Sequence, residues 1–181
     1  QLFEHAAHTA RQVGQHTLLG SQGRSIVSVA LDLADEVTEK DWPTRRALVF
    51  GTGAYAGATI AALRDRGCTD IWVNSRSGRA PEFAAKRDVF AVPEGGMEQA
   101  MAEADLIIGC SGGSAPLQPE QIPAGHHTIL DLALSRDFDP SVADLPNVEL
   151  ITLESVRLAA PEETEEAVAT ALRIVESELA A

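Results

Sequence analysis

The residues best suited to chemistry are those of the stretch 51–56, Gly-Thr-Gly-Ala-Tyr-Ala, which follows an apolar run and precedes an Ala-rich helical pattern. A glycine turn between a strand and a helix leaves the first amide groups of the helix unpaired at the positive end of its dipole. Phosphate groups are stabilised at such a position, and the missing side chain at Gly53 lets them approach the backbone. The alternative is a turn that only joins strand to helix. The strand before and the helix after favour the phosphate-binding start of a dinucleotide-binding βαβ unit.

A second group of polar residues, Asn74-Ser75-Arg76-Ser77, stands at the carboxyl end of the next expected strand. In NAD-binding sheets an acidic residue at this end accepts the ribose hydroxyl, but Asp70 lies at the amino end of the strand. The guanidinium of Arg76 and the neighbouring hydroxyls suit a 2′-phosphate instead. We therefore predict NADP in preference to NAD. The alternative is that Arg76 is a solvated loop arginine.

Two further strand ends are expected to face the same crevice. Residues 106–109 are uniformly apolar and end in the small-residue turn that begins Cys110-Ser111-Gly112, which we expect to line the cofactor. Cys110 is interpreted as a small apolar residue, because no sequence-near His or Lys would lower its pKa. Asp131 falls near the end of another apolar strand and is either a structural acceptor for loop amides or a cofactor-side group, of which we favour the first.

Alternating apolar runs and amphipathic patterns must position these groups. Strands are predicted over residues 47–50, 70–74, 89–92, 106–109, 128–132 and 148–152. Helices are predicted over 25–37, from the glycine turn to 66, over 79–87 with an early break at Pro81, over 97–104 and over 161–179, and a loop over 14–23. This order predicts an α/β fold of Rossmann type, three αβα layers around a mostly parallel sheet, with flanking helices at both termini.

Composition excludes several classes of function. The chain has 181 residues and a formal charge of -13, so by itself it is a poor binder of nucleic acid. Two distant cysteines argue for a reducing compartment, and without an apolar run of membrane-spanning length or a signal peptide the chain is expected to be cytoplasmic. His5 and His8 lack further ligands nearby, so no metal site is assigned.

Four stretches together resemble the NADPH-binding domain of glutamyl-tRNA reductase: residues 20–29, 51–56, 75–77 and 131–140. The last, Asp-Leu-Ala-Leu-Ser-Arg-Asp-Phe-Asp-Pro, is similar to a block that other Rossmann domains lack. The sequence departs from the family at Ala56, which replaces the last fingerprint glycine, at Ser75 and at Ser135.

The resemblance implies an NADPH-dependent enzyme that reduces glutamyl-tRNA to glutamate-1-semialdehyde in tetrapyrrole (haem) biosynthesis. It also implies a cysteine-bearing domain and a helical dimerisation domain that this sequence does not contain, so the chain is interpreted as an isolated cofactor domain, inactive alone. The implied partners are glutamyl-tRNA in the full-length enzyme, a second copy and glutamate-1-semialdehyde aminomutase. Three parts are expected: a helical connection over 1–40, the NADP-binding Rossmann domain over 41–160, and a helix over 161–181 leading toward the dimerisation domain.

No catalytic residue is assigned within the chain. The expected cofactor-binding residues are Gly51, Thr52, Gly53, Ala54, Tyr55, Ala56, Asn74, Ser75, Arg76, Ser77, Cys110, Ser111, Gly112 and Leu132. Two alternatives remain open: an NADP-dependent oxidoreductase domain of the shikimate-dehydrogenase kind, which would need its own substrate domain with a lysine and aspartate pair, and a non-catalytic dinucleotide-binding module.

Overall fold

A six-stranded sheet forms the centre of the computed structural model, which describes residues 19–113, 115–159 and 169. The strands are β1 Arg46–Phe50, β2 Asp70–Asn74, β3 Phe90–Ala91, β4 Leu106–Gly109, β5 His127–Asp131 and β6 Val148–Thr152. They pair in the order β3-β2-β1-β4-β5-β6, and every pair is parallel. The Rossmann-type α/β prediction is confirmed.

The chain order of the strands reverses beside β1. In β1, Val49 pairs with Val73 of β2 on one side and with Ile108 of β4 on the other. The connections from β1 and β4 leave on opposite faces, so a crevice opens outside the carboxyl ends of these two strands. This edge of the sheet carries all three groups of candidate residues.

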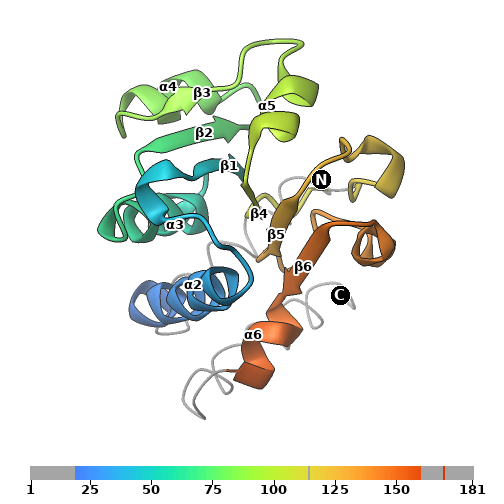
Figure 1. Cartoon of the computed structure of the whole chain (residues 1–181). Helices are drawn as coiled ribbons and strands as arrows, with labels where there is room; N and C mark the ends of the chain where they lie inside the picture. The colour runs from blue at the N-terminus through green and yellow to red at the C-terminus, as the bar shows by residue number, and fades with distance from the viewer. Residues whose placement is uncertain (1–18, 114, 160–168, 170–181) are drawn as a thin grey trace, which may run out of the picture.

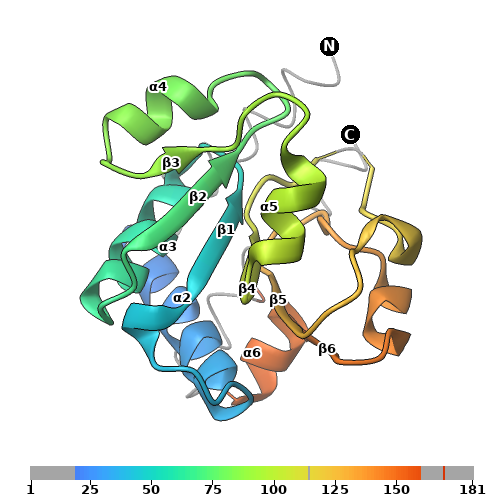
Figure 2. The same cartoon turned by 45° about the horizontal axis from the view of Figure 1, so that its top comes forward.

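Helices cover both faces of the sheet. They are α2 Leu19–Glu36, α3 Ala54–Asp65, α4 Ala80–Ala85, α5 Met97–Glu103 and α6 Leu153–Ala159. Figures 1 and 2 show α2 and α3 side by side on one face and α5 on the other. Successive side chains of a strand point to opposite faces, so β1 contributes Val49 to the core with α2 and α3, and Leu48 to the core with α5.

Three predictions of local structure were wrong. α2 begins at Leu19, inside the predicted loop over 14–23, because extending an existing helix is cheap enough to include Gly20 and Gly23. Pro81 stands in the first turn of α4, where its missing N–H costs nothing, and does not break it. The helix α6 follows β6 directly and was not predicted. The predictions for residues 1–18, with His5 and His8, and for the helix over 161–179 lie outside the described residues, apart from residue 169.

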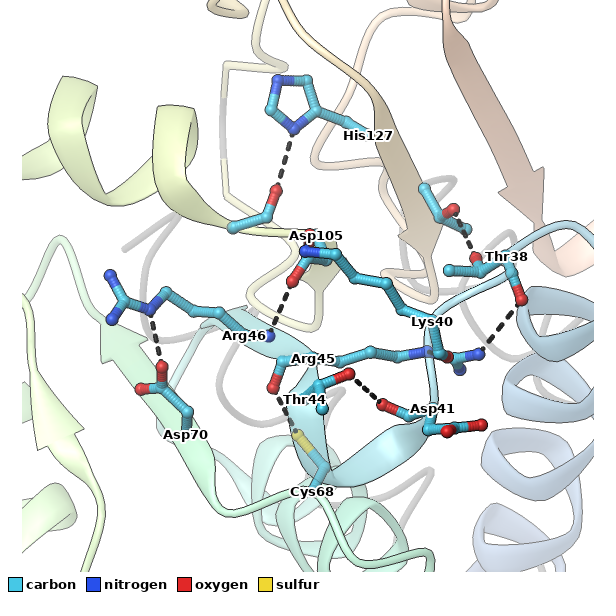
Figure 3. A network of polar contacts seen from close by, with 12 residues as sticks. Thr38, Lys40, Asp41, Thr44, Arg45, Arg46, Cys68, Asp70, Asp105 and His127 are labelled. Carbon is cyan, nitrogen blue, oxygen red and sulfur yellow. Dashed lines mark hydrogen bonds and ion pairs between the residues drawn. The ribbon is translucent and has the colours of Figure 1, made fainter.

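The opposite, amino edge of the sheet is closed by a polar network (Figure 3). The Nε of Arg46 lies 2.7 Å from a carboxylate oxygen of Asp70, and the backbone N–H of Arg46 donates to Asp105 at 2.9 Å. Lys40 also donates to Asp105, at 2.5 Å. The network joins the starts of three neighbouring strands, and it shows that Asp70 serves the amino edge, as its position in the sequence indicated.

Candidate functional site

The glycine turn after β1 is shaped by its two neighbouring strands. Gly51 has a φ of 112°, and its N–H donates to the carbonyl of Asn74 at 2.8 Å. A Cβ atom at Gly51 would lie 3.0 Å from the carbonyl carbon and oxygen of Cys110. Only glycine fits this backbone and this space, so the turn is held between the ends of β2 and β4.

The first turn of α3 is open to a ligand. Its N-cap is Gly53, no side chain caps it, and a Cβ added at Gly53 would meet nothing within 4 Å. The hydroxyl oxygen of Thr52 is buried and has no hydrogen-bond partner among the described residues. Ala56 is fully buried against the core, which accommodates its methyl group in place of the fingerprint glycine. These features fit a bound phosphate, which would accept hydrogen bonds from the free amides and the hydroxyl.

A cavity of about 430 Å³ lies between this turn and α4. Its lining residues are Thr52, Gly53, Ala54, Arg79, Glu82, Phe83, Lys86 and Arg87. Three of the eight are basic, in a chain of net charge -13, so positive charge is concentrated here. Sequence reasoning missed Arg79, Lys86 and Arg87, because basic residues at the two ends of a short helix form no motif. Their grouping in an acidic chain was the one available signal.

The loop after β2 places its basic side chain toward β4. The Nη2 of Arg76 donates to the carbonyl of Ala115 at 2.7 Å, and a Cβ at Gly113 would lie 2.6 Å from Nη1. Arg76 therefore reaches over the end of β1 at the carboxyl edge and does not line the cavity beside α4. The hydroxyls of Ser75 and Ser77 lie 2.8 Å apart, and Arg79 donates to Ser77 at 2.8 Å.

The turn after β4 is held by Asp137, which lies 26 residues later. The buried carboxylate of Asp137 accepts from the N–H of Ser111 at 2.8 Å, its hydroxyl at 2.5 Å and the N–H of Gly113 at 3.2 Å. A Cβ at Gly109 would lie 2.7 Å from Cβ of Asp137, so only glycine leaves room for this contact. The N–H and hydroxyl of Ser111 are thus already paired within the protein.

Asp131 in turn holds the segment that carries Asp137. Its carboxylate accepts from the backbone N–H of Asp137 and of Phe138, each at 3.1 Å, and of Ala133 at 3.3 Å. Burial raises the pKa of Asp131, while these hydrogen bonds oppose the rise. Of the two roles left open, the structure shows the structural one. Leu132, also a predicted site residue, is buried in the core, and its N–H donates to the carbonyl of Gly109 at 2.9 Å.

Neither thiol of the chain is activated. Burial raises the pKa of Cys110 to about 12, although a contact of 3.5 Å with the hydroxyl of Thr59 lowers it. Burial likewise raises the pKa of Cys68 to about 11 and that of Tyr55 to about 12. These groups stay protonated at neutral pH.

No cluster of His, Cys, Asp and Glu among the described residues could hold a metal ion, and no helix in that part is long and apolar enough to cross a membrane.

A parallel sheet of this order, with an open glycine turn at its switch point, defines the class: a Rossmann-type domain that binds a nicotinamide dinucleotide. The profile of the shikimate / quinate 5-dehydrogenase family matches residues 32–159, and the chain belongs to that family.

Within this family the chain is similar to glutamyl-tRNA reductases, which confirms the resemblance found in the sequence. It is 68% identical over 176 residues to the glutamyl-tRNA reductase of Kocuria rhizophila, covering 97% of this chain and 40% of that protein. The chain spans about 40% of the length of the curated relatives it matches.

Solved structures share the fold. Glutamyl-tRNA reductase from Methanopyrus kandleri matches with a TM-score of 0.67 and 23% identity, over 98% of this chain and 48% of that one. Shikimate 5-dehydrogenase from Thermus thermophilus, in complex with NADP(H) and shikimate, matches with a TM-score of 0.60 and 24% identity, over 83% and 62% of the two chains.

Proposed function

We propose that this chain binds NADPH along the carboxyl edge of its sheet, with the pyrophosphate on the open first turn of α3. The observation that carries the proposal is the combination of a free helix N-terminus, the empty space at Gly53 and the unpartnered hydroxyl of Thr52. The buried hydroxyl of Thr52 without a partner is a cost to the fold, and a phosphate on the exposed first turn of α3 would give both this hydroxyl and the free amides an acceptor.

The preference for NADPH over NADH is supported by charge. The residues at the carboxyl end of β2 and just after it are Asn74-Ser75-Arg76-Ser77, and they contain no carboxylate that would repel a 2′-phosphate. Arg79 and Arg87 add positive charge in the neighbouring cavity. A phosphate with two negative charges is stabilised by such a surrounding, whereas a ribose hydroxyl gains little from it.

We further propose that the chain is the cofactor-binding part of a glutamyl-tRNA reductase, in which NADPH supplies a hydride to a glutamyl group activated as a thioester. The name of the relatives, of which the one from Kocuria rhizophila is 68% identical, supports this reaction, with glutamate-1-semialdehyde as its product. Because both cysteines have raised pKa values, the chain contributes cofactor binding and not the nucleophile. Glutamyl-tRNA, a second copy and the aminomutase that takes the semialdehyde are the partners proposed for the longer enzyme.

The match to the shikimate / quinate dehydrogenase profile supports a second candidate, an NADP-dependent dehydrogenase of that kind. Its chemistry needs a lysine and aspartate pair at the substrate. Lys40 pairs with Asp105 at the amino edge, and Lys86 pairs with Glu82 on α4. These placements favour the reductase.

Calorimetric titration of the full chain with NADPH and NADH tests the proposal. We expect NADPH to bind more tightly, and we expect Arg76→Ala to reduce that preference without lowering the melting temperature, since its contact with Ala115 is exposed. Absence of binding to either cofactor would contradict the proposed function. Oxidation of shikimate by the chain with NADP⁺ would favour the second candidate.

A further inference from the structure

One cation in the cavity between α3 and α4 is fixed in place without an anionic partner. The guanidinium carbon of Arg87 lies 3.8 Å from the centroid of the Phe83 ring, and no carboxylate among the described residues forms an ion pair with it. By contrast, Lys86 is paired with Glu82 at 2.6 Å, and Arg79 donates its Nε to Ser77. Acidic residues outnumber basic ones by 27 to 14 in this chain, so an arginine that forms no ion pair with a described carboxylate is available to an anion from outside.

The position of Arg87 depends on a glycine of the neighbouring helix. A Cβ at Gly57 would lie 3.2 Å from Nη2 of Arg87 and 3.5 Å from its Nε. Gly57 lies within α3, where glycine is disfavoured by about 1 kcal/mol relative to alanine. Its missing side chain leaves a notch beside the guanidinium, so that Phe83 on one side and Gly57 on the other hold the cation against the first turn of α3.

We propose that Arg87 is a specificity-determining residue, whose guanidinium recognises the 2′-phosphate of the adenosine half of the cofactor. The inference rests on the proposed function, because it needs the pyrophosphate on α3 to bring the adenosine ribose to the same cavity. A guanidinium has a fork of donors that suits a phosphate dianion and has little to gain from a ribose hydroxyl. The paired Glu82 is the one carboxylate in the lining, and Lys86 neutralises it. Arg76 donates to the carbonyl of Ala115 and does not line this cavity, so its charge acts on the 2′-phosphate at longer range and we expect Arg76→Ala to lower the NADPH to NADH ratio less than Arg87→Gln does.

Two matched pairs of ligands test the proposal on the full chain. Calorimetry with NADPH and NADH, and with 2′,5′-ADP and 5′-AMP, isolates the contribution of the 2′-phosphate. We expect Arg87→Gln to weaken NADPH and 2′,5′-ADP by about tenfold or more and to leave NADH and 5′-AMP unchanged within about twofold. The double variant Glu82→Gln, Lys86→Gln is the control, since it removes the neighbouring ion pair of the same lining and leaves the net charge of the cavity unchanged. We expect it to change the NADPH to NADH ratio less than Arg87→Gln does.

Gly57→Ala is a second variant that keeps the charge and displaces it. We expect the melting temperature to rise or stay level, because alanine is the better helix former, while the preference for NADPH falls by a few-fold. An Arg87→Gln protein that keeps the wild-type ratio of NADPH to NADH affinity would overturn the role of Arg87 and leave the proposed function standing. A wild-type chain that binds neither dinucleotide would overturn both.

Discussion

Alanine substitutions at the two glycines of the β1 turn separate a structural role from a binding role. At Gly53 the φ of -88° suits any residue and a Cβ meets nothing within 4 Å, so we expect Gly53→Ala to fold normally. The stabilisation of about 0.4–1 kcal/mol from a stiffer unfolded chain offsets the poorer capping by alanine. The free energy of unfolding is therefore expected to change by less than about 1 kcal/mol.

The same methyl group occupies the space through which a pyrophosphate would reach the α3 amides. Losing one or two hydrogen bonds to a charged group costs about 2 kcal/mol, which is roughly a 30-fold loss of NADPH affinity. Gly51→Ala has the opposite expectation for stability. Its φ of 112° and the 3.0 Å approach to the Cys110 backbone predict a destabilisation of about 2–4 kcal/mol, or a fall in melting temperature of roughly 4–16 °C.

Calorimetry with NADPH and thermal unfolding by circular dichroism measure the two quantities on the same preparations. Wild-type affinity in Gly53→Ala would refute the placement of the pyrophosphate. Equal destabilisation by both substitutions would refute the assignment of Gly51 as the sterically required glycine.

Three further predictions concern buried groups. Asp137→Asn is expected to lower the free energy of unfolding by about 2 kcal/mol. The carboxylate accepts three hydrogen bonds from Ser111 and Gly113 on its two oxygens, whereas an amide has one acceptor oxygen. A urea midpoint equal to that of the wild type would contradict this prediction. With its pKa raised to about 12, Cys110 is expected to resist iodoacetamide at about pH 8 in the folded chain and to react in urea, as mass spectrometry would show; rapid labelling of the folded chain would be inconsistent with its burial. Burial raises the pKa of Asp131 in the folded chain above 3.8, so the folded chain binds the proton of this carboxyl more tightly than the unfolded chain does. The stabilisation that protonation of Asp131 gives is therefore expected to grow as the pH falls from the raised pKa toward 3.8. An NMR titration of the Asp131 carboxyl carbon with a midpoint at or below 3.8 would disprove this prediction.

Much of the fold was predictable from short-range pattern. Apolar runs bounded by glycine or polar residues predicted all six strands to within two residues of their ends, and the boundaries of β2, β4 and β6 were correct. The glycine turn and the position of Asp70 at the amino edge were predictable for the same reason. Each depends on residues that are neighbours in the sequence and on a regular strand direction.

The rest depended on contacts between distant residues. Asp137 holds Ser111 across 26 positions, and no local pattern distinguishes that carboxylate from a solvated one. Arg87 lies beside Gly57, which is 30 positions away in the sequence. The basic residues that line the cavity therefore come together only when α3 and α4 pack against each other. The side-chain rotamer of Arg76 is fixed by its hydrogen bond to Ala115 in the turn after β4. The residues next to Arg76 in the sequence do not determine it.

The carboxylate beneath the β4 turn gives the crevice a direction. Its α3 and α4 side offers free amides and the guanidinium groups of Arg79 and Arg87. Its β4 and β5 side holds the buried carboxylates of Asp131 and Asp137, and there the guanidinium of Arg76 donates to the carbonyl of Ala115. A long molecule with phosphates at one end and an uncharged or cationic ring at the other gains electrostatic energy in one orientation and loses it when reversed. We therefore expect the protein to favour one orientation of such a ligand along the crevice.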